Sequence, residues 1–338
     1  MGVTIQDLAI AARVSTASVS RVLNNKDKVS AEIRSRVLKT ADRLNYVPNS
    51  AARALASQRT LTIGAVIPTL ENPGFAIGVE ALQNYLEAHG YTLFVASSNY
   101  DQKKEKRQVE KLVTRGVDGV MLVGSKHSRG LIEFLRQQRK PFVETWVHSK
   151  YEDTPAIGFD NCAAAMLLAE YLLDLGHIWL GVIGGITKAN DRARDRVRGI
   201  RLALKKRGLK LARENFLERP FRIVDGQKAM RTLLAMNPRP TAVMCGNDVL
   251  AFGALLECQR QGIAVPDEMS VTGFDNLDFA SQLVPSLTTI RIPAAEIGEA
   301  AACYLLSAIA GEEVPPLPKI KVDMIVRRST APPPAYNR

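Results

Sequence analysis

The chain has few of the residues that build disulfide frameworks or metal sites. Only four cysteines and four histidines occur among its 338 residues, and no two cysteines form a C-x-x-C pair. The cysteines are widely spaced: Cys162, Cys245, Cys258 and Cys303. The histidines show no metal-ligand spacing either: His89, His127, His148 and His177. We therefore expect reduced cysteines, no bound metal and a cytoplasmic location, with His177 in a structural role.

Long apolar runs and targeting signals are also missing. No stretch approaches the roughly 18 consecutive apolar residues that a membrane-spanning helix needs. The start Met1-Gly2-Val3-Thr4 lacks the charged segment and apolar core of a signal peptide. A hydrophobic fraction of 46% is that of a soluble globular protein. The length predicts two or three folding units, and no membrane partner is expected.

The motifs of several enzyme classes are absent. The chain contains no G-x-x-x-x-G-K-[ST] phosphate-binding loop, no G-x-S-x-G nucleophile turn and no H-E-x-x-H metal motif. The pair Gly184-Gly185 does not extend to a dinucleotide-binding fingerprint. We accordingly predict no catalytic residues and no cofactor. A cytosolic enzyme on an α/β scaffold remains an alternative, which a turnover assay would test.

Three short amphipathic helices are expected in the first 46 residues. Thr4, with Asp7 three residues later, has the spacing of a capping box that opens a helix. Ser15 and Ser30 are candidate caps of a second and a third helix. Apolar residues recur at helical spacing, so the three helices can share one small core. Those residues are Ile5, Leu8, Ala9, Ala12, Val19, Val22, Ile33, Val37, Ala41 and Leu44.

The second of these helices has the properties of a nucleic-acid reader. Its small outward residues Thr16, Ala17 and Ser20 allow a close approach to the major groove, and Arg21 can offer a bidentate contact to guanine. Residues 1–60 carry ten Lys and Arg against four acidic residues, an excess expected opposite a polyanion. A three-helix scaffold that binds a protein and a merely solvated basic face are the alternatives.

This segment resembles the DNA-binding head of the LacI/GalR family of bacterial transcription regulators. The resemblance implies a helix-turn-helix domain over residues 1–46 and a hinge helix and linker over 47–60. Leu55 matches the family's apolar wedge in the minor groove, with an ordinary linker core as the alternative. Two wedges need two chains, so a homodimer on a pseudo-palindromic double-stranded DNA operator is expected. The predicted DNA contacts are Thr4, Ser15, Thr16, Ala17, Ser18, Ser20, Arg21, Asn24, Asn49, Ala52, Arg53 and Leu55.

From Leu61 onward, short apolar runs alternate with amphipathic stretches, as in β-α-β units of parallel sheets. The expected strands are 62–68, 92–96, 119–123, 142–146, 156–159, 179–183, 242–245 and 270–273. The expected helices lie near 75–89, 101–115, 129–138, 161–175, 190–207, 226–236 and 247–261. Because these units are about twice as many as one sheet usually holds, we predict an α/β core, residues 61–330, of two doubly wound parallel-sheet subdomains.

The two predicted subdomains share the chain unevenly. The first takes residues 61–159 plus 291–318, and the second takes 160–290 plus 319–330, with a tail over 331–338. The chain is expected to cross near Leu287–Pro293, to form a helix over 295–310 on the first subdomain, and to return at Ile320–Val326. A small ligand should bind in the crevice between the sheets, at the carboxyl ends of their strands.

Residues 61–330 resemble the effector-binding core of the same family, which is shaped like the periplasmic sugar-binding proteins. Four phrases carry the resemblance: Arg196–Gly199, Cys245–Asp248, Val271–Asn276 and Pro285–Ile290. The resemblance implies that an effector binds in the crevice and that the core also forms the homodimer.

The resemblance also implies effector contacts, residue by residue. Asp275 matches the family's effector-binding acid, whose carboxylate accepts from vicinal hydroxyls, and Arg196 matches its effector-binding arginine. Asn247 matches an amide-bearing helix start, and Phe75 and Phe221 match aromatic walls. The alternatives are that Asp275 and Arg196 simply pair with each other and that the aromatics are plain core. The full predicted set is Phe75, Lys126, Glu144, Trp146, Arg192, Arg196, Phe221, Asn247 and Asp275.

The chain departs from the family at the end of the fourth strand. Several members have an aspartate where this sequence has Thr145, preceded by Glu144, so their sugar-hydroxyl contacts do not transfer directly. Glu144, with the phrases Glu257–Arg260 and Ile157–Asn161, most resembles the gluconate-utilisation branch. Six cationic residues near the cleft suit an anionic sugar acid, or else are solvated surface charge: Lys126, Lys188, Arg192, Arg194, Arg196 and Arg222.

The sequence thus predicts a repressor of sugar-acid catabolism whose operator affinity is set by a small-molecule effector. The alternatives are a regulator of the same family that responds to a neutral sugar or a purine, and a solute-binding protein. The proline-rich stretch 331–338 cannot form the leucine-heptad helix that tetramerises some relatives, so a dimer is expected.

Overall fold

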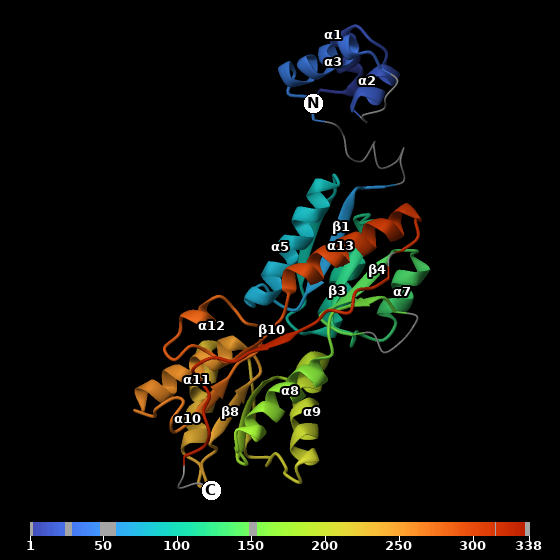
Figure 1. Ribbon diagram of the computed structural model, residues 1–338. Coiled ribbons are helices and arrows are strands. Elements are labelled where there is room, and N and C mark those ends of the chain that lie inside the picture. Colours follow the sequence, from blue (N-terminus) through green and yellow to red (C-terminus); the bar gives the residue numbers. More distant parts are fainter. Residues whose placement is uncertain (1–2, 24–28, 48–58, 149–153, 315, 335–338) are drawn as a thin grey trace. The chain divides into compact units, whose positions relative to one another are not determined.

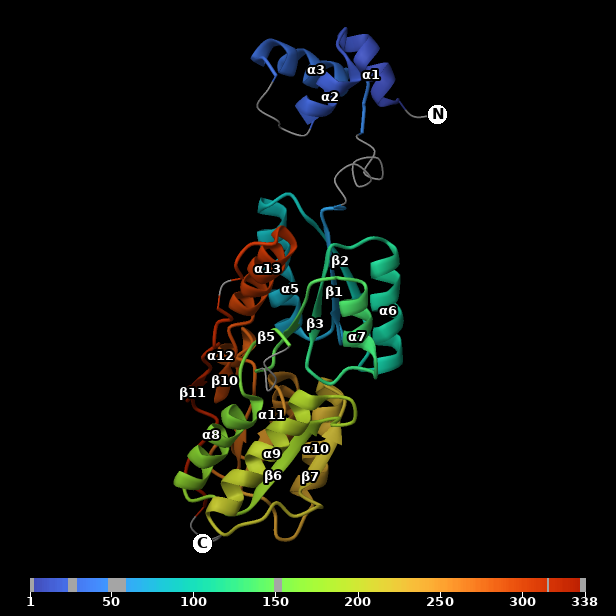
Figure 2. The ribbon, with the colours of Figure 1, turned by 90° about the vertical axis from the view of Figure 1, so that its right-hand side faces the viewer.

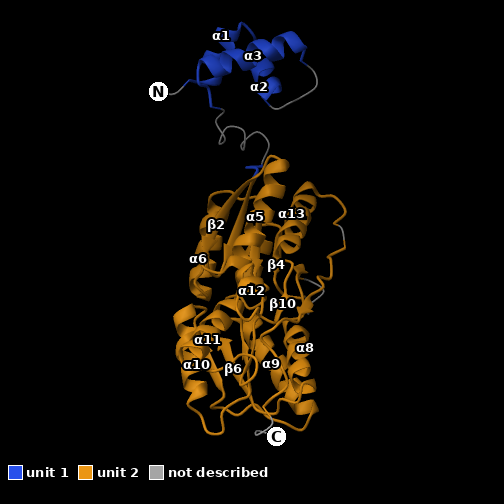
Figure 3. Cartoon of the chain, turned by 60° about the vertical axis from the view of Figure 1, so that its left-hand side comes forward, with its two compact units in different colours: residues 1–61 blue, residues 62–338 orange. Residues whose placement is uncertain are grey.

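The computed structural model describes residues 3–23, 29–47, 59–148, 154–314 and 316–334 (Figure 1). The chain forms two compact units, Met1–Leu61 and Thr62–Arg338, which are coloured separately in Figure 3. Each unit is described below by itself.

The first unit is a bundle of three short helices, α1 (Ile5–Ala12), α2 (Thr16–Leu23) and α3 (Ala31–Arg43). The predicted capping box is confirmed: the Thr4 hydroxyl accepts from the Asp7 amide at 3.2 Å, and the Asp7 carboxylate accepts from the Thr4 amide at 2.8 Å. Ser15 accepts from the Ser18 amide at 3.1 Å, and Ser30 caps α3, so all three predicted helix starts are confirmed.

The core of the first unit follows the predicted apolar positions. Ile33 and Leu44 pack against it but stay half-buried, because they lie at its edge. The buried residues are Leu8, Ala9, Ala12, Val19, Val22, Val37 and Ala41. Because the core of this bundle is small, its caps contribute a correspondingly large share of its stability.

The second unit begins with a five-stranded parallel sheet in the order β2-β1-β3-β4-β5. Helices α5 and α13 pack together on one face, and α6 and α7 cover the other face (Figure 2). We call this assembly the first subdomain. Its strands are β1 (Thr62–Ile67), β2 (Thr92–Ser97), β3 (Gly119–Val123), β4 (Phe142–Thr145) and β5 (Ala156–Ile157). Its helices are α5 (Pro73–Ala88), α6 (Gln102–Thr114), α7 (Leu131–Gln137) and α13 (Ala294–Ala310).

A four-stranded parallel sheet in the order β7-β6-β8-β9 forms the second subdomain. Helices α8 and α9 pack as one pair, and α10 and α11 as another. Its strands are β6 (Leu180–Gly185), β7 (Phe216–Arg219), β8 (Ala242–Cys245) and β9 (Ser270–Thr272). Its helices are α8 (Asn161–Asp174), α9 (Asp191–Lys206), α10 (Ile223–Leu234), α11 (Asp248–Arg260) and α12 (Phe279–Gln282). The predicted fold class, a helical head and a core of two parallel-sheet subdomains, is confirmed.

Two glycines set how closely the main helix pairs approach. A Cβ at Gly199 would lie 2.1 Å from the carbonyl oxygen of Cys162, so α9 packs with its backbone against α8. A Cβ at Gly298 would lie 2.0 Å from the carbonyl oxygen of Gly78, which brings α13 equally close to α5. Any larger residue at either position must push the helices apart.

Three strands were not predicted from the sequence. β7 is a half-exposed edge strand of four residues, and it has no continuous apolar run from which a strand could be predicted. The segments of the two predicted crossings pair with each other as an antiparallel ladder, β10 (Thr289–Arg291) with β11 (Asp323–Ile325). This ladder ties together the segments by which the chain passes between the subdomains.

Candidate DNA-binding and effector sites

The first unit exposes the predicted reading face of α2. Thr16, Ala17 and Arg21 are exposed, whereas Val19 and Val22 face the core. The hydroxyls of Thr4 and Ser15 are held by their own helix caps, so they orient backbone amides rather than reach freely outward. The predicted contacts Asn24, Asn49, Ala52, Arg53 and Leu55 lie outside the described residues.

A cleft between the two subdomains collects most of the predicted effector contacts. Side chains from both sheets converge there at the carboxyl ends of the parallel strands, which is where open α/β sheets bind ligands. The structure brings together seven of the nine predicted residues: Phe75, Trp146, Arg192, Arg196, Phe221, Asn247 and Asp275. The remaining lining residues are Asn72, Gly74, Tyr100, Asn190 and Ala193.

Arg196 is held at the floor of this cleft by several partners. Its Nε donates to Asn161 Oδ1 at 2.9 Å, and its Nη1 donates to the Gly246 carbonyl oxygen at 2.7 Å. The guanidinium carbon lies 3.6 Å from the centre of the Phe274 ring, in a cation–π arrangement. Burial lowers the pKa of Arg196 to about 10, so it remains charged at neutral pH. The guanidinium is therefore a fixed cation facing the cleft.

Asp275 faces Arg196 from the loop after β9. Its Oδ1 lies 3.8 Å from Arg196 Nη2, which is an ion pair without a close hydrogen bond. Burial raises the pKa of Asp275 to about 6, although Arg196 opposes the shift. The residue also has a φ of 115°, a backbone conformation that non-glycine residues rarely adopt. Strain of this kind persists where surrounding contacts impose it, and it is common at ligand sites.

Asp248 supports the loop that carries Asp275. Its Oδ1 accepts from the Thr289 hydroxyl at 2.6 Å and its Oδ2 from the Leu277 amide at 2.7 Å. Burial, and then the charge of Asp275, raise the pKa of Asp248 to about 7. In the sequence, Asp248 is only part of a family phrase, and no role was predicted for it. Its position directly after a helix cap was the available signal.

Two aromatic pairs form the walls of the cleft. Phe75 and Trp146 meet edge to face, with ring centres 5.2 Å apart. Tyr100 and Phe221 come from opposite subdomains, and their ring centres are 6.3 Å apart. Tyr100 was not predicted, because a tyrosine in a loop after a strand carries no distinctive spacing. Burial raises its pKa, so the phenol is a neutral donor.

Amide groups supply the neutral polar lining. Asn247 Oδ1 accepts from the Leu250 amide at 2.9 Å and caps α11. Its Nδ2 is buried and has no hydrogen-bond partner among the described residues. An unpaired buried donor is costly, and a ligand acceptor would satisfy it. Asn72 and Asn190 cap α5 and α9 in the same way, which places three amide side chains at the cleft.

Two predicted effector contacts do not reach the cleft. Lys126 is exposed, and its backbone oxygen accepts from Gln102. Glu144 is buried on β4, 3.3 Å from His127 Nε2. Lys126 was predicted from its charge and Glu144 from the resemblance, but the loop path and strand alternation direct both elsewhere. Thr145, at the departure from the family, donates to the Leu122 carbonyl at 2.6 Å.

The other cationic candidates separate into two groups. Lys188 and Arg222 line the outer mouth of the cleft, together with Lys103 and Arg219. Arg194 is exposed on α9 and lines neither part of the cleft. The cationic surroundings therefore belong mainly to the mouth, whereas the floor is charge-balanced.

Chemistry other than ligand binding finds little support in the described segments. They contain no group of three or more His, Cys, Asp and Glu that could hold a metal ion. The four cysteines are free thiols, and burial raises the pKa of Cys258 to about 12. His177 is structural, as expected, since its ring bonds to Thr241 and Ser270. Of the helices that the structure describes, none is both long and apolar enough to span a bilayer.

Comparison with known proteins defines the class of this protein. Residues 4–49 match the bacterial regulatory proteins of the lacI family, and residues 169–330 match a periplasmic binding protein-like domain. The chain is 33% identical over 328 residues to the transcriptional repressor CytR of Escherichia coli K12, covering 97% of this chain and 96% of CytR. It is 34% identical over 334 residues to the repressor PurR of Pectobacterium carotovorum, covering 97% of each.

A solved structure extends the comparison. The transcription regulator GntR from Chromobacterium violaceum superposes with a TM-score of 0.76 at 29% identity, covering 80% of this chain and 99% of that one. The protein is thus a helix-turn-helix transcription regulator with an effector-binding core. It belongs to the LacI family, whose members are DNA-binding repressors rather than enzymes. The gluconate branch stays a prediction, since the repressors CytR and PurR match 97% of the chain, whereas GntR matches 80%.

Proposed function

We propose that this LacI-family repressor controls sugar-acid catabolism and that an anionic, gluconate-like sugar acid sets its operator affinity from the cleft. It acts as a homodimer on a pseudo-palindromic operator, in the cytoplasm. The observation that carries the effector class is the pair of guanidinium groups, Arg192 and Arg196, that line the cleft floor together with Asp275 and three amide side chains. A guanidinium binds a carboxylate through two parallel hydrogen bonds, which a neutral sugar cannot match.

The rest of the floor suits a polyhydroxylated chain. The Asp275 carboxylate can accept from neighbouring hydroxyls, and the unpaired Nδ2 of Asn247 can donate to a ligand oxygen. The Phe75 and Trp146 rings offer an apolar wall to the carbon chain. The outer cations Lys188, Arg219 and Arg222 attract an anion toward the mouth.

A purine or nucleoside effector is the second candidate. The Tyr100 and Phe221 rings lie on opposite sides of the cleft, and such rings can stack on a base. The full-length relatives CytR and PurR also favour keeping this candidate. In that case Asp275 and the amides would read the base and the ribose.

Operator binding tests the proposal. A labelled pseudo-palindrome from the upstream region of this gene is titrated at fixed salt, with fluorescence anisotropy as the readout. D-gluconate and related keto-acids are compared with a neutral sugar, a purine base and a nucleoside. We expect a sugar acid to raise the Kd of the protein for its operator at least tenfold, a change within the range of allosteric coupling. Release by the purine or nucleoside alone would overturn the effector class.

The cleft assignment has its own matched pair of variants. Arg196→Ala should keep operator binding without effector but lose the gluconate response. Arg198→Ala, two residues along α9, removes a guanidinium that is 53% exposed and lies outside the cleft, so it should leave the response intact. A folded Arg196→Ala protein that still responds fully would contradict the assignment.

A further inference from the structure

A polar connection joins the two subdomains at the loop after β3, residues 124–128. The Ser125 amide donates to Asp191 Oδ2 at 2.6 Å, and the Ser125 hydroxyl donates to the same oxygen at 2.9 Å. Ser125 belongs to the first subdomain, whereas Asp191 is the first residue of α9 in the second. Asp191 is only 4% exposed, whereas Ser125 is exposed, so the two bonds are partly buried on the Asp191 side.

The other oxygen of the same carboxylate holds an arginine of the effector cleft. Arg192 Nη1 donates to Asp191 Oδ1 at 2.9 Å, and Arg192 lines the cleft floor. Burial opposes the charge of Asp191, but Arg192 and the Ser125 donors more than offset it and keep its pKa below the usual value. The charged Asp191 carboxylate therefore binds both Ser125 of the first subdomain and Arg192, the cation that faces the cleft.

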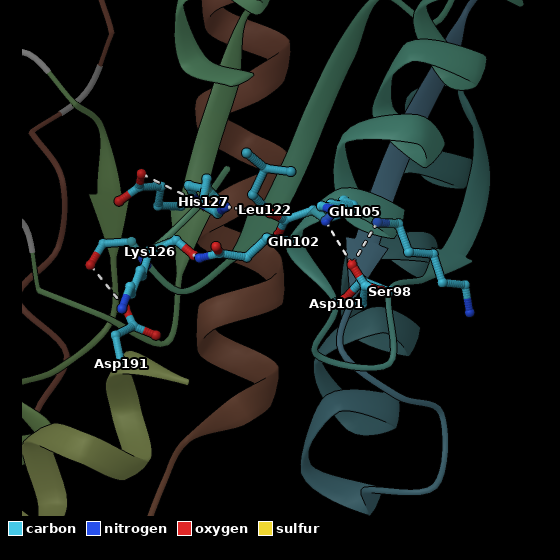
Figure 4. A network of polar contacts seen from close by, with 12 residues as sticks. Ser98, Asp101, Gln102, Glu105, Leu122, Lys126, His127 and Asp191 are labelled. Carbon is cyan, nitrogen blue, oxygen red and sulfur yellow. Dashed lines mark hydrogen bonds and ion pairs between the residues drawn. The ribbon is translucent and has the colours of Figure 1, made fainter. Parts of the chain in front are cut away.

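The loop that carries Ser125 is itself fixed to the first subdomain (Figure 4). Gln102 on α6 donates to the Lys126 carbonyl at 2.7 Å. The His127 ring lies between Glu105 and Glu144, at 3.0 and 3.3 Å. Gly124 leaves room for the arginine, because a Cβ there would lie 2.0 Å from Arg192 Nη1. A displacement of Asp191 must therefore act on the whole loop of residues 124–128.

We propose that Ser125 and Asp191 form a clasp between the subdomains, and that Arg192 makes this clasp sensitive to the effector. This inference rests on the proposed function, since it concerns how ligand binding in the cleft is transmitted to the first subdomain. A carboxylate ligand drawn to Arg192 shifts the guanidinium, and Asp191 passes the shift to the first subdomain through the two Ser125 bonds. Asp191 is thus a positioning residue for the response, without touching the ligand itself.

The clasp can be tested in the effector-free, full-length protein. Hydrogen–deuterium exchange reports the Ser125 amide directly, and Trp146, buried in the cleft lining, reports cleft opening by its fluorescence. A Trp179→Phe background leaves Trp146 as the remaining tryptophan, since the chain has two. In that background we expect Asp191→Ala to speed exchange over residues 124–128 by at least tenfold and to shift Trp146 emission to the red.

Two further variants complete the test. Asp195→Ala removes the same charge one turn along α9, where Asp195 lies 3.8 Å from Arg198, and it should change neither readout. Ser125→Ala changes no charge and removes one of the two bonds, so it should speed exchange by about threefold. It decides the question if Asp191→Ala does not fold. Unchanged exchange and emission in Asp191→Ala or Ser125→Ala, or equal changes in Asp195→Ala, would overturn the clasp.

The effector arm separates this proposal from the proposed function. With gluconate as the probe, Asp191→Ala should reduce the ligand-induced change in operator Kd by about tenfold. If gluconate has no effect on the unmodified protein, the effector class fails, while exchange and emission still decide the clasp. If gluconate acts equally on Asp191→Ala and on the unmodified protein, the clasp does not transmit the response and the inference is wrong.

Discussion

The substitution His127→Gln should remove part of the pH dependence of the free energy of unfolding. The His127 side chain is 4% exposed and lies between the carboxylates of Glu105 and Glu144. Burial alone would lower the pKa of His127, but the two carboxylates more than offset it and raise the pKa to about 9. The imidazolium is therefore the charged form that the folded chain prefers.

The sign follows from proton linkage. A pKa raised from 6.5 when unfolded to about 9 when folded stabilises the protein fully below pH 6.5, and this stabilisation is lost as pH rises through about 9. It amounts to about 3 kcal/mol at pH 7 and to less than about 1 kcal/mol at pH 9. His127→Gln removes this stabilisation. The loss in free energy of unfolding that the substitution causes should therefore be about 2 kcal/mol smaller at pH 9 than at pH 7.

Urea unfolding of both proteins at several pH values, followed by circular dichroism at constant ionic strength, measures this difference. His177→Gln is the matched control, because burial lowers the pKa of His177 and the ring is neutral in both states above pH 7. Its effect should be constant over the range. A His127→Gln effect that is equally constant would refute the charged Glu–His–Glu arrangement.

Two further predictions concern the reading helix and the core. Arg21→Ala should weaken specific operator binding by about 1–3 kcal/mol, the value of a bidentate base contact, whereas an unchanged anisotropy titration would remove Arg21 from the predicted contacts. Leu168 on α8 is 1% exposed, so Leu168→Ala should lower the free energy of unfolding by about 2–5 kcal/mol. A shift in the urea midpoint checks it, and the half-exposed Leu167→Ala, at 42% exposure, should cost much less.

Local patterns predicted much of the architecture. Thr4, Ser15 and Ser30 predicted where their helices begin, because a capping side chain binds backbone amides within three residues of itself. The strands Gly119–Val123 in the first sheet and Ala242–Cys245 in the second were correct in both bounds, because buried parallel strands are continuous apolar runs. Edge strand β7 and the β10–β11 ladder were missed, since their pairing depends on distant partners rather than on local composition.

The candidate site was predicted from family phrases. Asn247 and Asp275 follow parallel strands that end at one edge of the sheet, and Arg196 reaches the same cleft from within α9. Lys126, chosen for its charge, and Glu144, chosen from the resemblance, lie outside the cleft lining, because a charged side chain near a strand end can point to solvent or into a buried ion pair. No spacing in the sequence joins Ser125 to Asp191, which are 66 residues apart.

The sequence by itself determined the three-helix head and the two parallel sheets, because capping, periodicity and strand runs are local properties, and its motifs carried the resemblance to the family. The tertiary structure decided which charges meet. Asp191 contacts both Ser125 and Arg192 where the two subdomains meet, and His127 lies between two carboxylates inside the first subdomain, because folding brings together residues that are far apart in the sequence. The neighbouring charges and hydrogen-bond donors then outweigh burial and set the direction of the pKa shift of Asp191 and of His127.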